Sequence, residues 1–189
     1  YVNLHLPAGE RYSEIAMAWD CETRTARLLP SNGQRDYTQR RANEIVGTAD
    51  VVVVDGSRVV VSDVKTGRGA REEAARNSGQ LRFLALCAAR VFGATDIEIE
   101  LYHMDQDPDR SYPDRHTLDP FDLFDIEDEI DAIYREVKGG AQVPRSGPHC
   151  YGKWCPIAAT CPATMAMLAR IDEEAASGLP MVPTIENDE

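Results

Sequence analysis

The sequence predicts an α/β domain with a mixed central sheet and flanking helices, and three segments carry this prediction. Two valine-rich runs flank an Asp-Gly pair in "GTADVVVVDGSRVVVSDVKTG", residues 47–67, a pattern that favours a β-hairpin. Residues 80–92, "QLRFLALCAARVF", read as a buried helix with glycine after its end. Residues 96–104, "DIEIELYHM", alternate polar and apolar side chains as a strand does.

The remaining segments complete this outline. Residues 11–19 and 24–29 alternate enough to predict a second hairpin around "DCET". Residues 105–116 read as a polar loop. Residues 119–137, "DPFDLFDIEDEIDAIYREV", have apolar side chains at helical spacing and predict an amphipathic helix.

The chain has 189 residues, enough for one domain with a core of its own. We expect a single domain over residues 1–176 and a flexible acidic tail over residues 177–189. No apolar run approaches the length of a membrane span, and no signal peptide is visible. These patterns predict a cytoplasmic protein without membrane contact. The chain begins at Tyr1 rather than Met, which leaves open whether an N-terminal segment precedes it.

The first hairpin carries charges that a core strand pair does not need. A two-residue or a four-residue loop would place Asp50, Asp63 and Lys65 on one face at one end of the hairpin, whereas a three-residue loop would not. Paired carboxylates favour a bound cation such as Mg²⁺ or Mn²⁺. With a neighbouring lysine, they suit metal-assisted hydrolysis of a phosphodiester. The alternative interpretation is a solvated edge hairpin.

The ordered motifs resemble the PD-(D/E)XK nuclease superfamily, most closely its RecB-type exonuclease domains and the CRISPR-associated adaptation nucleases. The resemblance covers roughly residues 10–165. "GTAD", ending at Asp50, is similar to the family's G-x-x-D strand, and "DVKTG" from Asp63 is similar to its (D/E)-x-K strand. Gln80 stands where the Q-x-x-x-Y element begins, although Leu84 replaces the tyrosine.

The resemblance implies a restriction-endonuclease-like fold and a metal-dependent DNA nuclease, in particular an exonuclease. It implies that Asp50, Asp63 and the Val64 carbonyl bind Mg²⁺ or Mn²⁺. Lys65 would orient or deprotonate the attacking water, and Gln80 would position DNA or a ligand water. DNA is then the expected partner, together with a helicase or another DNA-processing protein. The rival hypothesis is a catalytically degenerate module that acts as a DNA-binding or protein-interaction scaffold.

The charge distribution limits how this chain could bind DNA. The net charge is −12, which argues against tight nonspecific binding to a polyanion. Residues 58–90 nevertheless hold seven basic and three acidic residues. Four arginines follow the Asp-x-Lys strand and are candidates for phosphate contacts, or else for a solvated helix face: Arg68, Arg71, Arg76 and Arg82.

A cysteine cluster lies in "PHCYGKWCPIAATCPA", residues 148–163. Cys150, Cys155 and Cys161 are spaced as metal ligands of intracellular proteins commonly are. The resemblance implies a 4Fe-4S cluster, although the spacing here is Cys-x4-Cys-x5-Cys rather than Cys-x2-Cys-x5-Cys. The fourth thiolate would be Cys21 or lie in a preceding segment. Zn²⁺ is the alternative metal, and unligated thiols are the third possibility. Either metal would act as a structural staple.

Overall fold

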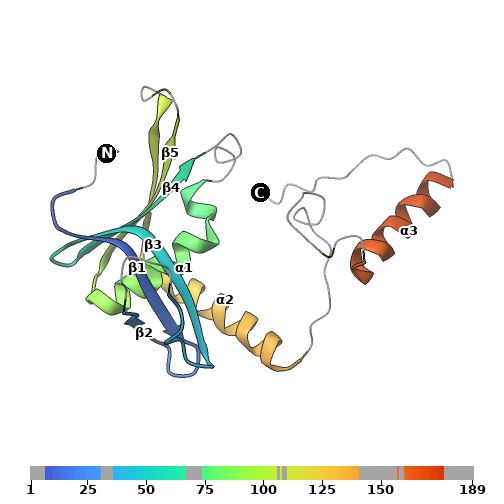
Figure 1. The fold of residues 1–189 in the computed structure, drawn as a ribbon, viewed down its shortest axis with the longest axis horizontal. Coiled ribbons are helices and arrows are strands. Elements are labelled where there is room, and N and C mark those ends of the chain that lie inside the picture. Colours follow the sequence, from blue (N-terminus) through green and yellow to red (C-terminus); the bar gives the residue numbers. More distant parts are fainter. Residues whose placement is uncertain are drawn as a thin grey trace. The chain divides into compact units, whose positions relative to one another are not determined.

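The computed structural model describes residues 7–30, 36–66, 74–105, 107, 110–140, 157 and 160–176. The chain divides into two compact units, residues 1–135 and 136–189, and each is described by itself. The extent of the predicted single domain stays a prediction. The elements labelled in Figure 1 are β1 Glu10–Asp20, β2 Thr25–Leu28, β3 Glu44–Asp55, β4 Arg58–Thr66, η2 Ala75–Asn77, α1 Gly79–Phe92, β5 Asp96–Met104, β6 Tyr112–Leu118, α2 Pro120–Lys138 and α3 Pro162–Ala176.

The first unit is built on a six-stranded mixed sheet with the order β2-β1-β3-β4-β5-β6. Neighbouring strands are antiparallel except β4 and β5, which are parallel. Parallel neighbours need a crossover connection, and α1 lies in the connection between these two strands. The predicted mixed sheet with flanking helices is therefore confirmed.

The β3–β4 hairpin turns at Gly56 and Ser57, one residue later than an Asp55-Gly56 loop would have it. Asp55 pairs with Arg58, and Gly56 has a φ of 59°, which a residue without a Cβ adopts at little cost. The register is therefore the one expected for the four-residue loop. Pairing is recorded as far as Val51 and Ser62, and the next step of the same register sets Asp50 opposite Asp63.

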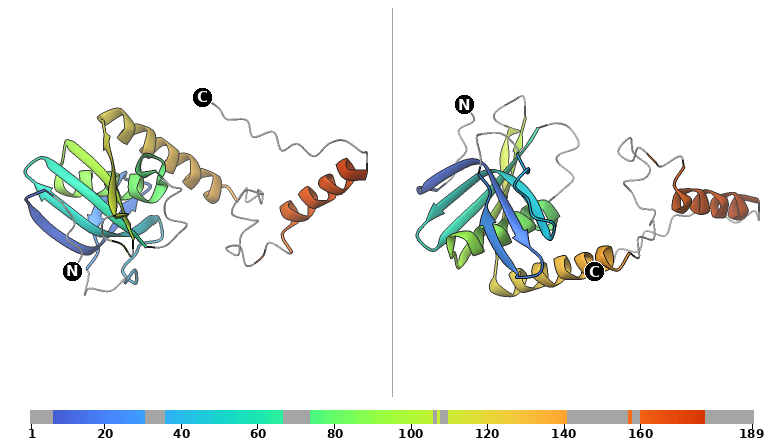
Figure 2. Two further views of the ribbon diagram at one scale, coloured as in Figure 1. Left: turned by 90° about the horizontal axis from the view of Figure 1, so that it is seen from above. Right: turned by 60° about the horizontal axis from the view of Figure 1, so that its bottom comes forward.

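The main core lies between one face of the sheet and the helices α1 and α2. Ser78 caps α1 by accepting a hydrogen bond from the Leu81 N–H, and Gly93 ends the helix with a φ of 65°. Both predicted helices are confirmed. Side chains of α1, α2 and the sheet form one buried cluster, so the two helices cover the same face (Figure 2). The α2 members are Leu123, Ile126 and Ile130.

The sheet changes its facing pattern beside the predicted site. Glu14 has a φ of 51° within β1, a left-handed conformation that is uncommon for a residue other than glycine. On either side of it, Tyr12 and Ile15 both contact the main core, although strict alternation would set them on opposite faces. The partner strand shifts in the same way between Ala49 and Val52. Strand pairing is interrupted here, because Ser13 pairs with Val51 and Ile15 with Ala49, with Glu14 and Asp50 lying between these two rungs.

One strand and one helix lie where the sequence analysis predicts neither. The prediction of a polar loop over residues 105–116 is wrong at its C-terminal end, because β6 begins at Tyr112 and forms the edge of the sheet. Pro113 and the many charges hid this strand, and both are typical of edge strands. In the second unit, α3 begins at Pro162, a residue favoured in a first helical turn. None of the described helices is long and apolar enough to cross a membrane.

Candidate active site

The carboxylate of Asp50 is held against β4 by a main-chain donor. The N–H of Val64 donates a hydrogen bond of 2.9 Å to Asp50 Oδ2. Val64 lies between Asp63 and Lys65 in the sequence, so this bond fixes one acid of the predicted pair beside the strand that carries the other. In an antiparallel pair the N–H and C=O of one residue point to the same neighbouring strand. The Val64 carbonyl is therefore expected to point toward β3 and Asp50.

Asp63, Lys65 and Gln80 contact one another directly. Lys65 Nζ lies 2.8 Å from Asp63 Oδ2, and Gln80 Nε2 donates a hydrogen bond of 3.2 Å to Asp63 Oδ1. Gln80 stands in the first turn of α1. The first turn of α1 therefore orients the carboxylate of Asp63 on β4.

The two carboxylate oxygens of Asp63 differ in the hydrogen bonds that they accept. The side chain of Asp63 is only 7% exposed, and its Oδ2 accepts no hydrogen bond from the residues that the structure describes. The 2.8 Å approach of Lys65 Nζ is an ion pair by distance, but its angle does not complete a hydrogen bond. The charge of Asp63 is therefore compensated by Lys65, and the buried Oδ2 keeps the capacity to accept a bond from a further ligand.

The predicted residues thus lie together at the end of the β3–β4 hairpin away from its turn, with Asp50 bonded to Val64 and with Asp63 in contact with Lys65 and Gln80. Their predicted roles are not tested by this geometry. Among the residues that the structure describes, no group of three or more His, Cys, Asp or Glu side chains is arranged to hold a metal ion. Any ion here would depend on two carboxylates, main-chain oxygen, water and substrate. Mg²⁺ is commonly bound in this way.

Sequence reasoning missed the side chains that β5 and β6 bring to the same region. The register sets Lys65 beside His103 and His103 beside Tyr112. The His103 ring is stacked on the ring of Tyr112, with centroids 4.7 Å apart. His103 is only 4% exposed, and its Nδ1 has no hydrogen-bond partner among the described residues. The strand β6 is charged and contains Pro113, so no apolar alternation in the sequence indicates it.

The four candidate arginines have different positions. Arg82 Nη1 lies 3.1 Å from Glu129 Oε2 on α2, so this cation links the two helices. Arg76 in η2 is exposed and lines a pocket. Arg68 and Arg71 lie outside the described residues. Only Arg76 among the four therefore has a described position that suits ligand binding.

The cysteine prediction falls largely outside the described residues. Cys150 and Cys155 are among those outside, whereas Cys161 is a free, buried cysteine just before α3. Hydrogen bonds from the backbone N–H groups of Thr164 and Ala163 lower the pKa of the Cys161 thiol, which favours the thiolate. Burial raises the pKa of Cys21. Cys21 packs in the main core, an environment that disfavours the thiolate a metal requires.

Comparison with known proteins gives a family match. The model of the PD-(D/E)XK nuclease superfamily matches residues 7–162. No curated protein matches the chain. Solved structures that match include the crystal structure of SSO0001, with 18% sequence identity and a TM-score of 0.43. This match covers 82% of the present chain and 61% of that protein.

Proposed function

Because this chain belongs to the PD-(D/E)XK nuclease superfamily, we propose that it is a metal-dependent deoxyribonuclease, acting as an exonuclease. The observation that carries the proposal is the meeting of two acids, a cation and an amide at one end of the β3–β4 hairpin. The exonuclease mode and the choice of DNA rest on the motif resemblance alone. The same resemblance supports a helicase or another DNA-processing protein as a partner.

Mg²⁺ or Mn²⁺ fits the donors at this site. Asp50 and Asp63 would supply carboxylate oxygens and Val64 a main-chain carbonyl, and the unused buried Oδ2 of Asp63 supports this assignment. Hard oxygen donors are those that these ions prefer. Such an ion polarises a phosphoryl oxygen and lowers the pKa of a bound water.

The other residues would act through position and charge. Lys65 Nζ lies against Asp63, where it can orient or deprotonate a water beside the scissile phosphate and stabilise the charge that develops there. The motif resemblance implies that Gln80 positions DNA or a ligand water. Its bond to Asp63 Oδ1 supports a different role, in which the amide fixes the rotamer of the carboxylate.

The cysteines of the second unit are proposed as a separate structural centre. Cys150, Cys155 and Cys161 would bind a 4Fe-4S cluster, with Zn²⁺ as the alternative. Their close spacing supports this proposal. Protein purified without oxygen should be brown if the cluster is present, and Cys161→Ser should lose the colour. Colourless protein with about one zinc per chain would favour the alternative, and metal-free protein would contradict both.

The nuclease proposal is tested with the full chain on end-labelled linear DNA and on circular DNA, with Mg²⁺ or Mn²⁺. Asp63→Asn and Lys65→Met should each lower the cleavage rate by about 100-fold or more. Asp55→Asn is the matched control, since this exposed aspartate pairs with Arg58 at the turn end of the same hairpin. Cleavage of linear but not circular DNA is expected of an exonuclease.

Two outcomes would contradict the proposal in different ways. Full activity in both variants would remove these residues from the reaction. A wild-type chain that binds DNA but cleaves none of it with either metal would favour the scaffold hypothesis. One observation supports that hypothesis: Leu84, which replaces the family tyrosine, is fully buried and cannot reach a substrate.

A further inference from the structure

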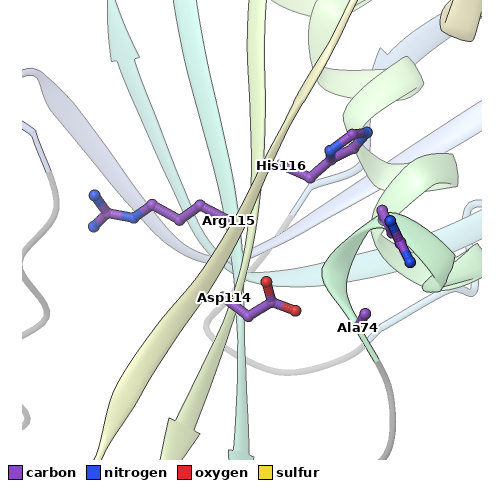
Figure 3. A pocket seen from close by; sticks show the side chains of 5 residues that line it. Ala74, Asp114, Arg115 and His116 are labelled. Atoms are coloured by element: carbon purple, nitrogen blue, oxygen red, sulfur yellow. The ribbon is translucent and has the colours of Figure 1, made fainter.

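A cavity of about 270 Å³ lies beside the proposed active site, between η2 and the edge strand β6. Its lining residues are Ala74, Arg76, Asp114, Arg115 and His116. Figure 3 shows Asp114 and His116 extending from β6 toward the side where Ala74 lies, whereas Arg115 extends to the other side. The side chain of Arg115 is engaged there by the carboxylate of Glu100 at 2.7 Å. It therefore does not serve the cavity.

Asp114 holds together the two elements that form the cavity, η2 and β6. Its Oδ2 accepts a hydrogen bond of 2.7 Å from the Ala75 N–H, which fixes η2 onto the edge of the sheet. Asp114 remains half-buried, and its Oδ1 is a further acceptor. Arg76 is exposed and makes no ion pair within the described part of the chain. The His116 ring adds one more polar group. The cavity thus combines donors with a carboxylate acceptor.

This mixture of groups distinguishes between two parts of a nucleic acid. A phosphate presents only acceptors, and the carboxylate of Asp114 would repel it. A nucleobase edge presents donors and acceptors together, and an exocyclic amino group donates to an Asp carboxylate. Adenine, cytosine and guanine carry that amino group, whereas thymine does not.

The cavity also lies at a suitable distance from the proposed site of cleavage. The sheet register sets Asp63 beside Leu101 and Leu101 beside Asp114. Two strand spacings separate Asp63 from Asp114, about 10 Å. A single nucleotide can span this distance with its sugar and base. Arg76 also stands only four residues before Gln80, which contacts Asp63.

We propose that this cavity binds the base of the nucleotide next to the scissile phosphate, turned out of the stack, and prefers a base with an exocyclic amino group. The proposal rests on the proposed nuclease function for its substrate. It makes Asp114 a specificity residue, with Oδ2 fixing η2 and Oδ1 accepting from the amino group. Single-stranded ends, whose bases are not paired, would meet this requirement most easily.

The test uses single-stranded oligonucleotides that differ at one position beside the cleaved bond, with the full chain and Mn²⁺. The wild type should show kcat/KM about tenfold higher with cytosine than with thymine at that position. Asp114→Asn can still accept from Ala75 N–H, but it presents an amide donor in place of Oδ1. This variant should lose or reverse the preference for cytosine over thymine. Asp125→Asn, on an exposed part of α2, should keep the preference.

Equal rates with all bases would contradict the proposal that this cavity binds a base selectively. A preference that Asp114→Asn leaves unchanged would contradict it as well. Should Asp114→Asn fail to fold, Arg76→Ala at an exposed position must weaken the preference instead. If the wild type cleaves nothing, the nuclease proposal fails. The pocket is then decided by fluorescence anisotropy on the same oligonucleotides, where the preference for cytosine and its loss in Asp114→Asn must still appear.

Discussion

The main-chain N–H of Val64 donates a 2.9 Å hydrogen bond to the carboxylate of Asp50. This bond joins the middle of β3 to the strand that carries Asp63, and its donor is a main-chain group. An oxygen site assembled in this way is preorganised, because neither strand has to move when a ligand arrives.

Metal binding should therefore stabilise the folded chain through these two acids. With Mn²⁺ at one hundred times its dissociation constant, the free energy of unfolding should rise by about 2.7 kcal/mol. Asp50→Asn and Asp63→Asn should lose most of this increase, whereas Asp55→Asn should keep it. Thermal unfolding with and without Mn²⁺ gives the comparison. An undiminished increase in Asp63→Asn would place the ion elsewhere.

The glycine of the "GTAD" strand has a packing reason that can be tested by Gly47→Ala. A Cβ at this position would lie 3.0 Å from Leu84 Cδ2 and 3.1 Å from Phe83 Cε1. Leu84 is fully buried, so α1 has little room to give way. We expect a loss of about 1–2 kcal/mol in the free energy of unfolding, measured by urea titration.

The matched control for this packing argument is Gly79→Ala in the first turn of α1. No atom lies within 4 Å of the Cβ it would add. This variant should be as stable as the wild type or gain about 0.5 kcal/mol. Equal effects of the two substitutions would show that backbone freedom, and not the contact with α1, determines the choice of Gly47.

The stability of the chain should fall in acid partly through Glu44. Arg27 Nε and Nη2 donate to the two oxygens of Glu44 at 2.8 and 2.9 Å. These bonds from Arg27 hold the pKa of Glu44 below its ordinary value of 4.5. A carboxyl whose pKa is lowered by folding stabilises the protein above its unfolded pKa and loses that contribution as pH falls through the folded pKa.

Glu44→Gln should therefore cost about 2 kcal/mol at pH 7, and this difference from the wild type should shrink as the pH falls below about 4.5. Urea unfolding at pH 7, 5 and 3.5 measures it. A difference that stays constant over this range would mean that the ion pair with Arg27 contributes nothing that depends on the charge of Glu44.

The elements with strong local patterns could be predicted from the sequence, because their signals do not depend on distant residues. Gly93 ends α1 as expected, and the valine runs form the paired strands β3 and β4. The hairpin pattern also predicts that Asp50 lies near the strand that carries Asp63, and Asp50 accepts a hydrogen bond from the Val64 N–H there. The turn itself is displaced by one residue, since Asp55 pairs with Arg58 rather than joining the loop.

The rest could not be read from local patterns. The kink at Glu14 depends on the pairing of β1 with β3, which reverses the facing of both strands at one rung. The strand β6 is charged and contains Pro113, so it lacks the apolar alternation of an interior strand. The cavity that Asp114 and Arg76 share requires this edge strand to lie beside η2, and no sequence spacing indicates that contact.

The last prediction concerns a buried carboxylate of β5 that pairs with Arg115 of the edge strand β6. Glu100 has a side chain that is only 1% exposed. It accepts hydrogen bonds from Ser62 Oγ at 2.8 Å and from Arg115 Nε at 2.7 Å. Arg115→Met removes the cation and leaves the charge buried, which should lower the free energy of unfolding by about 3 kcal/mol. Calorimetry and urea unfolding at pH 7 measure this loss.

Restoring neutrality should restore stability, because the cost lies in the unpaired charge rather than in the missing side chain. Glu100→Gln added to Arg115→Met should recover most of the loss, since an amide needs no compensating cation. Arg110→Met removes an exposed arginine that, within the described ranges, forms an ion pair with Asp107, and it should change stability by about 0.5 kcal/mol or less.

Arg115→Met should also leave the base preference intact, because Arg115 points away from the cavity. A lost preference at unchanged stability would instead make Arg115 a ligand contact.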